Sequence, residues 1–160
     1  MNATPNKDQA MNPAPLRRFV VGVDLSPESL YALDLAAMMG APNNTALRIV
    51  HVHPHPSSLG FSPMAAAEYE ESQRTVDDLL QAETAKRLGD YSGPWTTVVR
   101  HGQAGHELLA EADEVDADLL VVGHRSHGLI HDVLLGSVAT GAVHHSRRSI
   151  LVAIPPQTDH

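Results

Sequence analysis

The sequence predicts an α/β fold in which a five-stranded parallel sheet carries helices on both faces. Short runs of β-branched residues alternate with longer segments whose apolar residues recur at helical spacing. This alternation is typical of parallel strands joined by crossover helices. The runs at 119–122 and 150–154 are almost wholly apolar, as expected for strands that are buried on both faces. A length of 160 residues suits a single domain of this class.

The first predicted strand, Phe19–Asp24, leads directly into a helix start. Ser26 suits the N-cap position, where its hydroxyl can accept a backbone hydrogen bond. Pro27 suits the first helical position, because the N–H that proline lacks has no partner there. We expect the helix to end at Gly40 and Pro42.

The rest of the chain continues the alternation of strand and helix. The longest helical pattern ends before Gly89, and the later elements are shorter. In chain order the expected elements are a strand at 47–52, a helix at 64–88, a strand at 95–100, a helix through 108–115, a strand at 119–122, a helix from Leu135 and a strand at Ser149–Ile154.

Composition excludes several classes of function. A net charge of −8 argues against nucleic acid or an anionic membrane as the main partner. The chain has no cysteine and no apolar run long enough to span a bilayer. Residues 1–16 read as a disordered leader without the apolar core of a secretory signal, 17–155 as the domain and 156–160 as a tail. We therefore expect a cytoplasmic protein.

The segment after the fourth strand carries the strongest functional signal. Gly123 ends that strand, and a loop leads from it to Gly136-Ser137 at the start of the last predicted helix. Glycine permits close approach of the backbone to a ligand, and a helix start offers N–H groups and a positive dipole end to an anion. Parallel α/β folds bind ligands at this edge of the sheet. The segment therefore predicts a phosphate-binding loop.

These features together resemble a single-domain universal stress protein over Arg18–Pro155. The resemblance is carried by the first strand with Asp24 at its end, by His51-Val52, by Arg100-His101-Gly102 and by the segment 117–138. It implies the strand order 3-2-1-4-5 of folds similar to the adenine nucleotide alpha hydrolases.

The nucleotide-binding branch of that family implies ATP as the ligand, together with Mg²⁺. Asp24 would lie near the ribose or a magnesium ion, and Val52 would contact adenine through its backbone. The residues implied to surround the phosphates are Gly123, Arg125, Ser126, Gly136, Ser137 and Val138. Ser126 departs from the family motif, which has a glycine at that position.

The resemblance also implies a homodimer formed through the fifth strand, Ser149–Ile154, paired antiparallel with its copy. The first hypothesis is a cytoplasmic, ATP-binding stress sensor and regulator. Any hydrolysis would be slow, since no general base can be named. The second hypothesis is a dimeric interaction module of the same fold that does not bind nucleotide, and Ser126 favours it. A metal-dependent enzyme rests only on the count of eleven histidines.

The charged and histidine-rich segments are expected to have structural roles. His51, His53 and His55 share one face of an extended chain, but they match no metal-binding motif, so no metal ligand and no catalytic residue is assigned. The acidic residues of two helices are expected to form solvated faces. They are Glu68, Glu70, Glu71, Asp77 and Asp78 in the first, and Glu111, Asp113, Glu114 and Asp116 in the second.

Overall fold

The computed structural model describes residues 14–56, 62–124 and 148–156. Within them, five parallel strands form one sheet in the order β3-β2-β1-β4-β5, which confirms the predicted fold and strand order. The strands are β1 Arg18–Gly22, β2 Ala46–His53, β3 Trp95–His101, β4 Leu119–Gly123 and β5 Ser149–Ala153. Asp24 and Ile154 therefore lie just beyond strands that were predicted to include them. The predicted helix from Leu135 lies outside the described residues.

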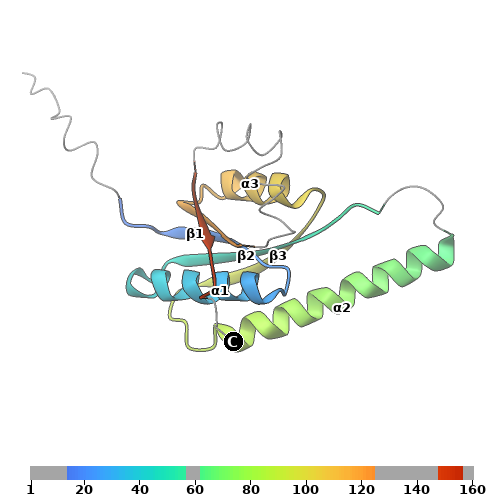
Figure 1. Ribbon diagram of the computed structural model, residues 1–160, viewed down its shortest axis with the longest axis horizontal. Helices are drawn as coiled ribbons and strands as arrows, with labels where there is room; N and C mark the ends of the chain where they lie inside the picture. Colours follow the sequence, from blue (N-terminus) through green and yellow to red (C-terminus); the bar gives the residue numbers. More distant parts are fainter. Residues whose placement is uncertain (1–13, 57–61, 125–147, 157–160) are drawn as a thin grey trace, which may run out of the picture.

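The helices cover both faces of the sheet. They are α1 Pro27–Gly40, α2 Pro63–Arg87 and α3 Ala104–Glu114, with a short 3-10 helix, η2 Ala41–Asn43, after α1. In Figure 1, α1 and α2 lie on one side of the sheet and α3 lies on the other. The amino-terminal part of α2 runs well past the end of the sheet. No helix in the described ranges is both long and apolar enough to cross a membrane.

The core has two layers because side chains alternate along each strand. Phe19 and Val21 of β1 pack in the layer under α1 and α2, whereas Val20 packs in the layer under α3. β4 divides its apolar residues between the two layers in the same way. Burial on both faces explains why β4, and β1 after Arg18, carry no polar side chain.

A fixed turn joins β1 to α1. Ser26 is the N-cap, and its Oγ accepts a hydrogen bond from the Ser29 N–H at 3.2 Å, as predicted. Asp24 Oδ1 accepts hydrogen bonds from the Ser26 N–H at 3.1 Å and from its hydroxyl at 2.5 Å. Leu25 between them has a left-handed φ of 64°. The Asp24 carboxylate thus holds both the strained turn and the helix cap.

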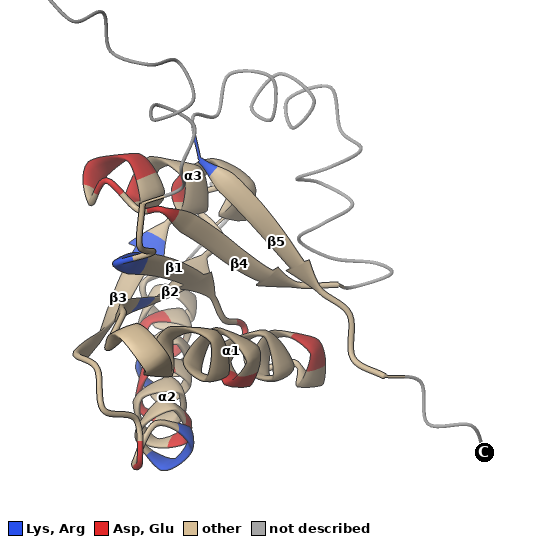
Figure 2. Cartoon of the chain, turned by 90° about the vertical axis from the view of Figure 1, so that its left-hand side faces the viewer, with Lys and Arg blue, Asp and Glu red and all other residues tan. Residues whose placement is uncertain are grey.

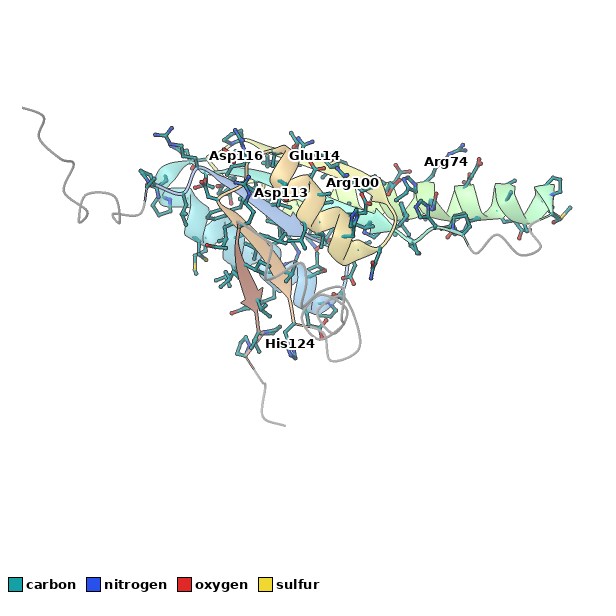
Figure 3. The ribbon with its side chains drawn as sticks, turned by 90° about the horizontal axis from the view of Figure 1, so that it is seen from above. Arg74, Arg100, Asp113, Glu114, Asp116 and His124 are labelled. Carbon is teal, nitrogen blue, oxygen red and sulfur yellow. The ribbon has the colours of Figure 1, made fainter. Side chains whose placement is uncertain are left out.

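Glu111 is a buried carboxylate, and the expectation that it is solvated is wrong. It is 1% exposed, and its two oxygens accept hydrogen bonds from Arg48 Nε and, at 2.5 Å, from Arg100 Nη1. Arg100 also donates to Glu107 and to the exposed Glu114, which Figure 3 shows on α3 close to Arg100. Two guanidinium groups offset the cost of burying this charge.

The arginine at the centre of this network gives the protein an acid-sensitive contribution to stability. Hydrogen bonding to Arg100 holds the pKa values of Glu107 and Glu114 below their usual value of 4.5. A lowered pKa in the folded state means that the unfolded chain binds more protons as the pH falls. This stabilisation is therefore present above about pH 4.5 and is lost as the pH falls through the folded-state pKa values.

We expect Arg100→Gln to flatten the fall in melting temperature between neutral pH and the pH range below about 4.5. Thermal melts followed by circular dichroism across this range measure the effect. The matched control is Arg74→Gln, because Arg74 pairs with Glu70 and Glu71 on the exposed part of α2 at 3.8 Å. An Arg100→Gln profile parallel to that of the wild type would contradict the assignment.

Candidate functional site

A pocket of about 130 Å³ opens at the carboxyl ends of β1 and β2, on the face of the sheet that α3 covers. After β1 the chain passes to α1 on one face, and β4, the other neighbour of β1, is reached through α3 on the opposite face. Ligands of parallel α/β folds bind at such a switch point. The pocket is lined by Gly22, Val23, Asp24, Val50, Val52, Ala104 and Leu108.

Two of the residues implied to bind nucleotide meet in this pocket. Asp24 and Val52 both line it, one from the turn after β1 and the other from β2. Gly123 ends β4, the neighbour of β1, at the same edge of the sheet, but it is not a lining residue. Arg125, Ser126, Gly136, Ser137 and Val138 lie outside the described residues.

Asp24 is the one titratable side chain among the described residues that line the pocket. Its position is fixed, because its carboxylate accepts two hydrogen bonds from Ser26 and its own N–H lies 3.2 Å from Ser29 Oγ. A fixed carboxylate can accept hydrogen bonds from sugar hydroxyls or bind a cation. The Asp24 carboxylate already accepts hydrogen bonds within the turn. A turn-forming role therefore explains this residue equally well without any ligand.

Gly123 has a packing role that the sequence did not reveal. A Cβ atom placed on Gly123 would lie 2.7 Å from the Ser29 N and closer still to the carbonyl of Glu28. The first turn of α1 therefore rests directly on the end of β4, and no side chain fits between them. The glycine is required for this contact whether or not a phosphate binds nearby.

α3 supplies two lining residues that the sequence analysis did not assign to the site. Ala104 begins α3, and Leu108 lies one turn later and is buried. Gly102, with a φ of 143°, makes the turn from β3 that brings this helix start to the pocket. The segment Arg100-His101-Gly102 could have indicated this, since its glycine places a turn at the carboxyl end of the strand, directly before α3.

The histidines of β2 lie on the opposite face from the pocket. His51 Nδ1 donates to the Val23 carbonyl at 2.8 Å, and the buried His53 is 2.8 Å from Asp77 Oδ1 on α2. Asp77 was expected on a solvated face, and it instead ties α2 to the sheet. Within 14–56, 62–124 and 148–156, no three His, Asp or Glu side chains form a group that could hold a metal ion. His127 and His131 lie outside the described residues.

Comparison with known proteins gives the family. The model of the universal stress protein family matches residues 15–153. Universal stress protein A homolog 1 of Coxiella burnetii is 31% identical over 143 residues, which is 84% of this chain and 94% of that protein.

Solved structures give the same result for the fold. The chain superposes on the universal stress protein UspA of Lactobacillus plantarum with a TM-score of 0.67 at 19% identity, covering 88% of this chain and 99% of the other. A universal stress protein crystallised in complex with cAMP is 27% identical, with a TM-score of 0.63 and coverage of 88% and 98%. On the family match and the sequence identity of its relatives, this chain belongs to the universal stress protein family.

Proposed function

We propose that the protein binds ATP with Mg²⁺ at the carboxyl ends of β1, β2 and β4, and acts as a nucleotide-dependent stress sensor and regulator in the cytoplasm. The observation that carries the proposal is the pocket beside the switch point, where Asp24 and Val52 come together as the family's nucleotide-binding branch implies. A relative at 27% identity is a complex with cAMP, so an adenine nucleotide is the ligand class that its fold accepts.

The pocket is large enough for only part of a nucleotide, so other residues of the chain must bind the rest. Its volume of about 130 Å³ is small beside the 300–1,000 Å³ of typical ligand pockets, so the described residues suit only part of a nucleotide. In this proposal Val52 contacts the base, Asp24 serves the ribose or the metal, and Gly123, Arg125, Ser126, Gly136, Ser137 and Val138 serve the phosphates. Any hydrolysis is slow, because the described lining offers one engaged carboxylate and no histidine.

Filling the pocket tests the proposed site directly. We expect Val52→Trp to weaken ATP binding at least about tenfold, because an indole at this position occupies the space assigned to the base. Isothermal titration of the nucleotide-stripped variant with ATP and magnesium measures the loss. Thermal melting shows whether the variant remains folded.

The matched control is Val99→Trp, which makes the same change on the edge strand β3 at a half-exposed valine outside the pocket. This variant should bind ATP as the wild type does. Equal affinities for ATP in wild type, Val52→Trp and Val99→Trp would show that the base does not bind beside Val52 and would overturn the proposed site.

We also propose that two copies associate through β5. β5 lies at the edge of the sheet, where the outer N–H and C=O groups of a strand are open to pairing. Ile154, which follows the strand, is 65% exposed, and three residues of β5 are only partly buried. A two-fold axis beside this edge would cover the apolar residues of both copies.

We expect Ile154→Glu to shift the protein from twice the 17.2 kDa chain mass toward the chain mass itself, because it places two carboxylates against each other at the axis. Light scattering coupled to size-exclusion chromatography measures the mass. Met64→Glu is the control, since Met64 is 74% exposed on α2, away from β5. A wild-type mass of one chain, or an unchanged dimer in Ile154→Glu, would contradict this interface.

A further inference from the structure

A second concave site lies at the end of the sheet opposite the proposed nucleotide site. It is a groove of about 370 Å³ at the amino ends of β1, β2 and β3, bounded on one side by Val115 at the end of α3. Its volume lies within the range of small-molecule sites, and its lining is largely apolar. The groove is formed entirely by described residues, and none of them also lines the pocket at the carboxyl ends.

Two guanidinium groups are held in fixed positions on this groove. Arg18 Nη1 donates to the Val115 carbonyl, and Arg48 Nε donates to the buried Glu111. These bonds use one donor group of each arginine. The Nε and Nη2 of Arg18, and both Nη groups of Arg48, have no hydrogen-bond partner among the residues that the structure describes. Each side chain is therefore anchored while most of its donors remain available.

The carboxylates at this end of the molecule already have partners of their own. Asp118 accepts the N–H groups of Arg17 and Arg18 at 2.7 and 2.9 Å. Asp113 and Asp116 accept from Arg148 at 3.0 and 2.6 Å. The groove lining itself contains two cations and no anion, although the chain carries a net charge of −8. Figure 2 shows arginine positions in blue close to the amino end of β1.

The remaining wall is apolar and partly aromatic. Pro94 and Trp95 bound the groove at the start of β3, with Ala46 on the neighbouring strand β2. Guanidinium donors beside apolar surface suit a ligand with a planar anion at one end and an apolar body at the other. The groove is too apolar for a highly hydrated ion such as free phosphate to use most of its surface.

We propose that this groove is a binding site for small carboxylates that carry an aromatic or aliphatic body, with Arg18 and Arg48 holding the carboxylate. The arginines also stabilise the fold through one hydrogen bond each, and the unused donors are what make the site. Because the site lies at the opposite end of the strands, it is independent of the proposed nucleotide pocket. Failure of either proposal leaves the other unaffected.

Sodium benzoate and benzamide form a matched pair of probes, since they share the ring and differ in the anionic carboxylate. Trp95 is the only tryptophan of the chain, so its indole N–H resonance reports on this groove. In a nuclear magnetic resonance titration of the full chain, we expect a saturable shift with benzoate at a Kd on the order of 1 mM, as suits a ligand of this size. Benzamide should bind about tenfold more weakly.

Substitutions of single arginines test which side chains contact the carboxylate of benzoate. Arg18→Gln and Arg48→Gln should each weaken benzoate about tenfold. The control is Arg17→Gln, which removes the same charge at the adjacent position but does not line the groove. Arg18→Gln leaves the contact between Arg48 and Glu111 in place, so it remains informative if Arg48→Gln unfolds. A wild-type titration repeated with saturating ATP should give the same affinity for benzoate.

Three results would overturn the proposal. They are benzoate binding no tighter than benzamide, no saturable shift of the Trp95 resonance with benzoate, and a loss of benzoate affinity in Arg17→Gln equal to that in Arg18→Gln. The last result would show a diffuse charge effect in place of a site. Failure of ATP to bind in the same sample would contradict the proposed function and leave the carboxylate site untouched.

Discussion

Gly123→Val should destabilise the protein by about 3 kcal/mol, near the upper end of the usual cost of overpacking. The added Cβ would lie 2.7 Å from the Ser29 N and even closer to the Glu28 carbonyl, and neither backbone group can rotate away as a side chain could. α1 would have to move off the end of β4. For a chain of this length the melting temperature should fall by about 6–12 °C, which calorimetry or circular dichroism measures.

Gly89 provides the control for this substitution. A Cβ at Gly89 would meet no heavy atom closer than 3.6 Å, so Gly89→Ala should melt close to the wild type. A Gly123→Val protein that melts with the wild type would contradict the close contact between α1 and β4. This prediction also affects how any loss of ATP binding is interpreted, because a displaced α1 disturbs Asp24 and Ser26 without any contact to phosphate.

Glu111→Ala should cost about 2–3 kcal/mol of stability. It leaves Arg48 and Arg100 facing each other without the carboxylate that both contact, and breaking a buried ion pair costs about 3–5 kcal/mol when both partners are fully buried. We take a lower figure because the Arg48 side chain is 37% exposed and water screens it. The corresponding fall in melting temperature is about 4–12 °C.

Glu114→Ala tests whether the loss of stability in Glu111→Ala comes from the burial of the carboxylate or only from its charge. Glu114 also accepts hydrogen bonds from Arg100, at 3.0 and 3.1 Å, but its side chain is 60% exposed. We therefore expect a much smaller change in melting temperature for this variant. Equal losses for the two glutamate variants would show that the network acts through surface charge and that burial of Glu111 contributes nothing.

The fold could be predicted from the sequence because local signals agree with one another along the chain. Ser26 and Pro27 mark the start of α1, and the apolar runs and helical periodicity of the other segments locate each described element to within a few residues. β4 and β5 were recognisable as strands of a parallel sheet by their continuous apolar runs. The order of strands came from the family resemblance, since local patterns do not determine which strands are neighbours.

Part of the candidate site was also predictable, because parallel strands bring their carboxyl ends to one edge. Chain order placed Asp24 at this edge, and the family resemblance added Val52; both residues line one pocket. The contribution of Leu108 was missed, because a leucine at helical spacing looks the same whether it packs in the core or also lines a pocket. The role of Ser126 stays a prediction.

Contacts between distant segments could not be predicted from local pattern. Glu111 lies among other acidic residues and looks like them in sequence, yet its partner Arg48 is 63 positions away. His53 and Asp77 are 24 positions apart and meet only because α2 crosses back over β2. The fit of α1 against Gly123 likewise depends on the packing of a helix onto a strand nearly a hundred residues later.

The most direct test of the central claim is isothermal titration of the nucleotide-stripped wild-type protein with ATP and magnesium. The proposed function predicts saturable binding with a stoichiometry of one nucleotide per chain. Absence of heat up to millimolar ATP, with the protein folded by circular dichroism, would contradict it. That result would favour the interaction module without nucleotide, in which the pocket beside Asp24 and Val52 is a remnant of the fold.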